Sequence, residues 1–154
     1  MVAVFPLLAA ASALLSVTGC IQSSLGAGLL ARFRRNERQP VVLGSPPPVT
    51  VLKPLYGSEP LLEEALESFC TQDYPRMQIL FGVRDADDPA IAVVRRLQER
   101  HPSLDMELVV DPALHGLNRK ISNLMNILPK ARHDILVISD SDIHVRPDYL
   151  QHIV

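Results

Sequence analysis

Residues 135–142 read ILVISDSD: four aliphatic residues are followed at once by two aspartates that one serine separates. An aliphatic run of this length is typical of a buried strand in a parallel sheet. Similar runs come earlier, so we expect strands at 49–52, 77–83, 106–110 and 135–138. Helical patterns lie between them, and this alternation predicts an α/β fold with a mostly parallel sheet that helices cover on both faces.

The three segments between the expected strands carry apolar residues at helical spacing. Ser58 is a candidate cap of the first helix, and Pro89 is a candidate first residue of the second. Cys70 should be a small core residue at the end of the first helix. The other side chains expected on buried faces are Leu61, Leu62, Ala65, Leu66 and Phe69 in the first helix, Ile91, Val94 and Leu97 in the second, and Ile121, Leu124, Met125 and Leu128 in the third.

Residues 1–31 contain no charged side chain and are long enough to cross a bilayer, which takes about 20 apolar residues. We therefore expect one transmembrane helix in this segment. Four arginines against one glutamate then give residues 32–48 a net charge of +3. Because basic residues are retained on the cytoplasmic side of a membrane, the chain after Arg32 should lie in the cytoplasm.

Two alternatives for the first segment stay open. The four residues from Val17 to Cys20 resemble a bacterial lipoprotein cleavage box in which Cys20 would carry the lipid, and a buried helix of a soluble protein would also be apolar. A cleaved signal peptide is disfavoured because its positive charge precedes the apolar run, whereas here the arginines follow it. The charge order therefore favours a transmembrane helix.

Residues 32–48 also contain Pro40, Gly44 and three consecutive prolines, a composition typical of a stiff extended linker. The α/β domain is expected at 49–154, where the net charge is −5; over the whole chain it is −2. These values give no electrostatic reason to expect nucleic acid as a partner. Two cysteines without a C-x-x-C motif provide neither a disulfide framework nor a zinc or redox site.

Ligands of parallel sheets bind beyond the carboxyl ends of the strands, so the residues there are the candidate site. Asp140 and Asp142 follow the last strand, and two carboxylates suit a hard divalent cation, Mg²⁺ or Mn²⁺. An ordinary acidic turn is the alternative for this pair. No Gly-x-Gly-x-x-Gly or phosphate-binding Gly-Lys-Ser/Thr loop follows any strand, which removes the main support for a dinucleotide or ATP site.

Two further clusters follow the expected strands. Asp85 lies nearest the second strand and is the candidate that faces a ligand, whereas Asp87 or Asp88 is a candidate cap for the helix at Pro89. Lys120 and its neighbour Arg119 begin the third helix, where its positive dipole end and two cations suit a diphosphate. A solvated basic turn is the alternative there.

The chain from residue 49 onward resembles the family 2-like glycosyltransferases of the GT-A fold. It is most similar to the ceramide glucosyltransferase group and its bacterial relatives of hopanoid biosynthesis. The motifs that carry this resemblance, in order, are KPLYG (53–57), SFCTQDYP (68–75), VRDADDPA (83–90), GLNRKISNL (116–124) and ISDSDI (138–143), with Pro147 and Asp148. An N-terminal membrane helix followed by a basic edge is also the layout of that group.

The resemblance implies a role for each candidate residue. Asp85 would contact the base of a nucleotide sugar, Lys120 would lie near its diphosphate, and Lys53 with Pro54 would line the nucleotide pocket. The last two candidates, Asp140 and Asp142, would bind the divalent cation, and the first of them the nucleotide sugar as well. The implied reaction is inverting transfer from a nucleotide sugar, UDP-linked by expectation, to a lipid hydroxyl such as that of a ceramide or hopanoid, at the bacterial inner membrane.

The same resemblance places the general base in a later aspartate that is followed by a Gln/Arg-x-x-Arg-Trp motif. The sequence contains no Trp and ends at Val154. We therefore expect the N-terminal part of a GT-A domain, with no catalytic residue in this chain and no activity of the chain alone. The alternatives are a non-catalytic nucleotide- or metal-binding module of the same fold and an exported lipoprotein that binds Ca²⁺.

A reporter protein fused after Val154 tests the expected orientation. A reporter that works only in the cytoplasm should be active, and one that works only in the periplasm should be silent, because the arginines from Arg32 to Arg38 hold this end inside. Replacing these arginines by glutamine should reduce the difference between the two reporters. Periplasmic activity, or lipid labelling at Cys20, would show that the orientation is wrong.

Overall fold

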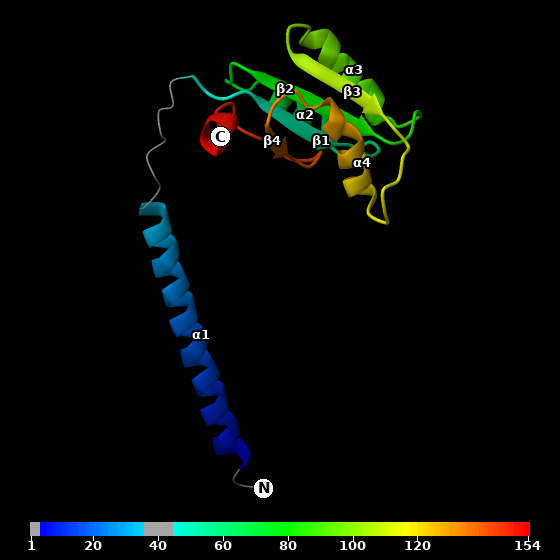
Figure 1. The fold of residues 1–154 in the computed structure, drawn as a ribbon. Helices are drawn as coiled ribbons and strands as arrows, with labels where there is room; N and C mark the ends of the chain where they lie inside the picture. The colour runs from blue at the N-terminus through cyan, green and yellow to red at the C-terminus, as the bar shows by residue number, and fades with distance from the viewer. Residues whose placement is uncertain (1–3, 36–44) are drawn as a thin grey trace. The chain divides into compact units, whose positions relative to one another are not determined.

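The computed structural model describes residues 4–35 and 45–154, and the chain divides into two units, Met1–Val42 and Leu43–Val154. Figure 1 shows one long helix in the first unit and a sheet with helices in the second. The expected linker at 32–48 lies partly outside the described residues, because 36–44 are not among them. The division falls within that linker.

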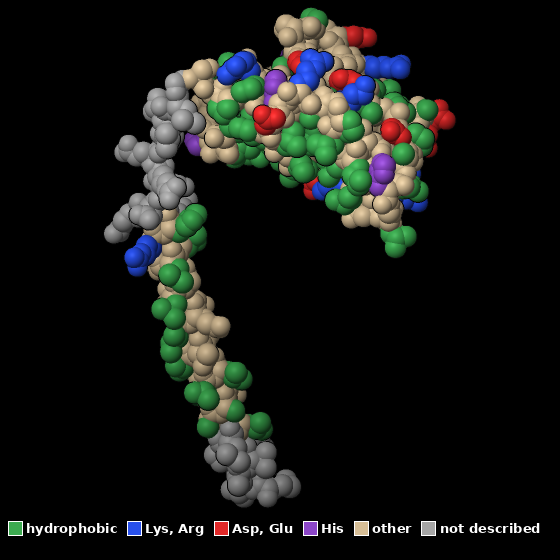
Figure 2. All heavy atoms as spheres, viewed as in Figure 1, with side chains coloured by type: hydrophobic (Ala, Val, Ile, Leu, Met, Phe, Trp, Pro, Cys, Tyr) green, Lys and Arg blue, Asp and Glu red, His purple; other side chains and the backbone are tan. Residues whose placement is uncertain are grey.

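Helix α1 (Val4–Arg35) accounts for the described part of the first unit. Its segment Leu8–Phe33 is long and apolar enough to cross a membrane by length and composition, and Figure 2 shows apolar side chains along the helix. Ser12, Ser16 and Thr18 each donate a hydroxyl to the carbonyl four residues earlier, at 2.9, 2.9 and 2.8 Å. These polar groups are thus satisfied within the helix, as a lipid environment would require.

The second unit contains a four-stranded sheet in the order β3-β2-β1-β4. All three neighbouring pairs are parallel, which confirms the predicted α/β class. The strands are β1 (Val49–Pro54), β2 (Met77–Val83), β3 (Asp105–Val110) and β4 (Ile135–Ile138). Every residue of β1 and β2 is buried because these strands have neighbours on both sides.

Helices lie on both faces of the sheet. They are α2 (Leu62–Cys70), α3 (Ala90–Arg100), α4 (Arg119–Ile127), the 3-10 turn η1 (Leu128–Lys130) and α5 (Tyr149–Ile153). Side chains alternate between faces along a strand, so Val51 packs in a large core with α2 and α3, while Leu52 packs in a small one with Ile127 of α4. Cys70 is in the large core as expected, and burial raises the pKa of its thiol to about 12.

The start of α2 differs from the expectation. Leu61 is the residue before the helix, with a φ of 60°, and its side chain is exposed. No side chain caps α2, so the proposed role of Ser58 is wrong. The sharp turn at Leu61 moves this leucine off the face that Leu62, Ala65 and Leu66 bury.

The buried face of α4 was also predicted wrongly. Three expected core residues, Ile121 and Met125 of α4 and Leu128 of η1, are 49%, 47% and 45% exposed. The residues buried instead are Ser122, Asn123, Asn126 and Ile127. The apolar spacing of α4 thus marks its outer side, and mainly polar side chains face the sheet.

Strand β4 is not buried throughout as predicted, because in the described part of the chain it pairs only with β1 and forms an edge. Only Val137 is buried, and Ile138 is 57% exposed. The pairing of β1 with β4 ends at Leu52 and Ile138, whereas β1 continues to Pro54 beside β2. Pro54 therefore lies past the end of the β4 ladder, where its missing N–H costs no hydrogen bond.

Helix α4 lies very close to Gly82 in β2, and this contact predicts how a substitution there would change stability. A Cβ at this position would clash with Asn123 Oδ1 and lie 2.6 Å from Ile127 Cγ2, so α4 can lie this close only against a glycine. Gly82→Ala should reduce the free energy of unfolding by about 1–3 kcal/mol, measured by chemical denaturation of the chain in detergent. Gly116→Ala is the control because its Cβ would meet nothing within 4 Å; equal stability of the two variants would contradict the prediction.

Candidate functional site

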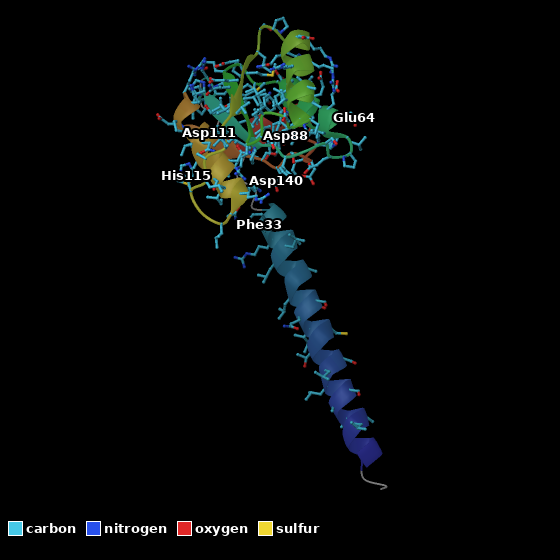
Figure 3. All side chains as sticks on the ribbon, turned by 90° about the vertical axis from the view of Figure 1, so that its right-hand side faces the viewer. Phe33, Glu64, Asp88, Asp111, His115 and Asp140 are labelled. Atoms are coloured by element: carbon cyan, nitrogen blue, oxygen red, sulfur yellow. The ribbon has the colours of Figure 1, made fainter. Side chains whose placement is uncertain are left out.

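A cleft of about 1030 Å³ lies at the carboxyl ends of the strands, a volume that suits a small-molecule ligand. Segments that follow all four strands and the first turn of α4 line it. Figure 3 views the unit from this end and labels Asp88, Asp111 and Asp140. The predicted site residues that line the cleft are Pro54, Asp85, Lys120, Asp140 and Asp142. The structure thus brings together five of the six candidates, and Lys53 is the exception.

Lys120 and Asp140 form an ion pair across the cleft, from the start of α4 to the turn after β4. Their side chains are 48% and 54% exposed, so solvent screens this pair. Asp142 makes no ion pair among the described residues and lines the same cleft. One of the two carboxylates is therefore partly neutralised by protein, and the other is available to a cation.

The carboxylates at this end of the sheet suit Mg²⁺ or Mn²⁺, which keep water or phosphate ligands. They suit a metal ion that is held by protein ligands alone less well. Among residues 4–35 and 45–154, no group of three His, Cys, Asp or Glu side chains could hold an ion by itself. Mg²⁺ characteristically takes one or two carboxylates and completes its shell with water and phosphate oxygens. Asp140 and Asp142 could supply those carboxylates, with a bound phosphate supplying further oxygens.

Lys53 differs from the expectation that it lines the pocket. Its side chain is fully buried at the end of β1, on the side of the sheet that α2 covers. Its Nζ donates to the backbone oxygen of Asp140 at 2.6 Å and to Ser139 Oγ at 3.2 Å. Burial lowers the pKa of Lys53 to about 8, although the carboxylates of Asp140 and Asp142 oppose this shift. Lys53 therefore binds the turn after β4 from the buried interior and not from the cleft.

Asp85 and Asp88 have different surroundings. Asp85 is exposed in the cleft, and its Oδ1 accepts a hydrogen bond from Asp87 N at 3.1 Å. Asp88 is buried, and its carboxylate accepts from Gly57 N at 3.0 and 3.1 Å and from Ala90 N at 2.9 Å. Asp88 thus binds the first N–H of α3, whose N-cap residue is Pro89, and it also fixes the loop after β1.

Sequence analysis missed the asparagines of α4. Asn123 Nδ2 donates to Gly82 O at 2.8 Å, beside the cleft that this residue lines. Asn126 Nδ2 donates to Asp111 O at 3.0 Å and to Ala113 O at 3.1 Å. Both side chains therefore tie α4 to the ends of the strands. Two asparagines three residues apart share one face of a helix, and this spacing was the available signal.

One arginine of the cleft, Arg84, was not given a role from the sequence, whereas Arg119 was expected with Lys120 as a contact of a diphosphate. Arg84 directly follows β2, and its Nη2 donates to Pro112 O at 3.2 Å. Arg119 is the first residue of α4. Together with Lys120 they place three cations in a cleft that also holds carboxylates. Such a mixed set can bind an anion and a divalent cation together.

Comparison with known proteins places these features in a family. The sequence profile described as Glycosyl transferase family 21 matches residues 8–154. Ceramide glucosyltransferase 1 of Caenorhabditis elegans is 38% identical over 102 residues, which are 66% of this chain and 22% of that protein. The ceramide glucosyltransferase of Candida albicans is 32% identical over 118 residues, with 69% and 22% covered. The chain thus spans about a fifth of the length of these relatives.

A solved structure shares both sequence and fold with this chain. The mannosyltransferase PcManGT from Pyrobaculum calidifontis, in complex with GDP-Man and Mn²⁺, is 30% identical, with a TM-score of 0.60. The similarity covers 88% of this chain and 41% of that one. A crystal structure of Staphylococcus aureus TarS, 22% identical with a TM-score of 0.55, shows the same fold over 68% of this chain and 30% of its own.

Asp88→Ala should destabilise the chain, because the partly buried amide of Gly57 and the buried amide of Ala90 would lose their acceptor. Such an unsatisfied donor costs about 1–3 kcal/mol of unfolding free energy, measurable by chemical denaturation in detergent. Asp88→Asn should cost less, since its amide oxygen can still accept one hydrogen bond. Asp87→Ala, which removes an exposed carboxylate, is the control. Equal stability of the two alanine variants would contradict the assignment of Asp88.

Proposed function

The chain belongs to glycosyl transferase family 21, and from that membership we propose that residues 49–154 bind the nucleotide sugar of a membrane glycosyltransferase that glycosylates a lipid. The GT-A fold that the sequence resemblance implied is confirmed by the solved structures that the chain matches. Because the chain spans only about a fifth of its curated relatives, the activity is proposed for the protein of which these residues form the donor-binding part.

The composition of the cleft carries this proposal. Asp140 and Asp142 share it with the cations Arg84, Arg119 and Lys120. A nucleoside diphosphate with a divalent cation needs both kinds of group, since its phosphate oxygens attract cationic side chains and its metal attracts carboxylates. A purely acidic cleft would repel the diphosphate, and a purely basic one would repel the metal.

We assign the residues as follows. Asp140 and Asp142 bind the cation and the donor, Lys120 contacts the diphosphate, and Asp85 contacts the base, while Pro54 forms part of the pocket wall. Lys120 can release Asp140 and turn to a phosphate oxygen, because both side chains are about half exposed. A bound Mg²⁺ or Mn²⁺ would offset the charge on the departing nucleoside diphosphate. The general base is proposed to come from the part of the family that this chain does not cover.

The proposed donor is UDP-linked, and the proposed acceptor is the hydroxyl of a lipid such as a ceramide or hopanoid. The names of the relatives support a ceramide-like acceptor and a glucosyl donor. The complex of PcManGT with GDP-Man and Mn²⁺ supports a nucleotide sugar and a divalent cation. Helix α1 would keep the donor site near the membrane that holds the acceptor, which we propose to be the bacterial inner membrane, with the cleft in the cytoplasm.

Calorimetric titration of the chain in detergent with UDP tests the proposal. UDP should bind at least about tenfold more tightly with Mn²⁺ than with EDTA, a gain of about 1.4 kcal/mol, because the metal joins the aspartates to the phosphates. Asp142→Asn should remove this gain and leave the weak metal-free binding. Asp87→Asn, an exposed aspartate outside the cleft lining, should keep the gain.

Two outcomes would overturn the assignments. Equal UDP affinity with Mn²⁺ and with EDTA would show that the aspartate pair does not hold a cation. Tighter binding of GDP than of UDP under the same conditions would contradict a UDP-linked donor.

A further inference from the structure

We propose that Lys53 is a positioning residue whose buried ammonium holds the main chain of the turn after β4, so that Asp140 and Asp142 present their carboxylates to a divalent cation in one arrangement. This inference rests on the proposed function, since it takes the two aspartates as the cation ligands. Lys53 itself contacts neither cation nor donor in this scheme.

The hydrogen bonds of Lys53 converge on consecutive residues of one turn. Its Nζ lies 2.6 Å from the backbone oxygen of Asp140 and 3.2 Å from Ser139 Oγ. Ser139 also donates its N–H to Leu52 O at 3.2 Å and its hydroxyl to Asp140 O at 3.3 Å. The ammonium therefore binds the carbonyl of Asp140 and not its carboxylate, which faces the cleft and pairs with Lys120.

The surroundings of the ammonium show why a charged side chain is tolerated at a fully buried position. Burying a charge is costly unless hydrogen bonds and a favourable field compensate. Besides its two hydrogen bonds, Nζ lies 3.7 Å from the centroid of the Phe69 ring, a cation–π contact. Phe69 is itself held edge-on by Tyr149, with the ring centroids 6.0 Å apart. Apolar packing alone would need only an uncharged side chain of similar length, such as methionine.

Two other roles for Lys53 make different predictions. Direct contact with the donor does not fit a side chain that is fully buried and is not among the cleft-lining residues. A role of Lys53 through its charge alone predicts a change of Mn²⁺ affinity in the opposite direction, because a fixed cation near a metal site repels the metal. Removing that charge would then tighten Mn²⁺ binding, whereas loss of positioning weakens it. The direction of the change separates the two explanations.

The test uses Lys53→Met, which keeps the length of the side chain and removes the ammonium. The measurement is the gain in UDP affinity that Mn²⁺ produces, from calorimetry of the chain in detergent with Mn²⁺ and with EDTA. We expect most of this gain to be lost, because removing a group that orients a metal ligand usually lowers the affinity for the metal about 10- to 100-fold. UDP affinity in EDTA should stay within about twofold, and Lys53→Arg, which keeps a cationic donor, should retain part of the gain.

Gln78→Met is the matched control for the loss of a buried polar side chain. Gln78 is fully buried near the start of β2, at the opposite end of the strands, where its Oε1 accepts from Thr50 Oγ1 and from Arg132 N, both at 2.9 Å. This variant should lower the stability of the chain and leave the Mn²⁺-dependent gain unchanged. A structural role of Lys53 without positioning would make the two methionine variants behave alike.

The outcomes separate this inference from the proposed function. If the unsubstituted chain shows no Mn²⁺-dependent gain, the proposed function fails. If it shows the gain and Lys53→Met keeps or increases it, the positioning role is overturned. If Lys53→Met does not fold, Ser139→Ala decides, since it removes one acceptor of the ammonium with little change in volume. Ser139→Ala should reduce the gain severalfold, and an unchanged gain would again overturn the role of Lys53.

Discussion

Parallel hydrogen bonding between β1 and its two neighbours is the constraint on which the candidate site depends. Pairing of β1 with β2 and with β4 brings the carboxyl ends of all three strands to one edge of the sheet. Asp85, which follows β2, and Asp140, which follows β4, thereby meet in one cleft although 54 positions separate them in the chain. An antiparallel neighbour would put one of these aspartates at the other edge. The chemistry of the cleft is thus a consequence of strand direction.

Strand direction is also the part of the fold that the sequence predicted best. Aliphatic runs separated by helical patterns leave few arrangements other than a parallel α/β sheet, and the rule that ligands bind at carboxyl ends then selected Asp85, Lys120, Asp140 and Asp142. What could not be predicted was the environment of each side chain. Lys53 lies near the carboxyl end of β1, where ligand-facing groups are expected, but its side chain is on the face under α2, against the ring of Phe69.

The error at α4 has a physical origin. Apolar spacing locates the buried face of a helix only when hydrophobic burial attaches the helix to its neighbours. Here Asn123 and Asn126 bind carbonyls at the strand ends, so polar side chains face the sheet and Ile121 and Met125 lie outside. Neither the carbonyls that these amides bind nor the close approach at Gly82 can be read from a helical pattern, because both arise from another segment of the chain.

The hydrogen bonds of Asn123 and Asn126 fix the position of α4 along its own axis. Hydrophobic attraction has no preferred direction, whereas an amide bound to one particular carbonyl has a single correct place. A shift of α4 by one turn, about 5.4 Å, would break the bonds of both asparagines at once and carry Lys120 away from Asp140. The two amides thus fix the distance between the charges on the two sides of the cleft, in addition to the packing of Ile127 in the small core.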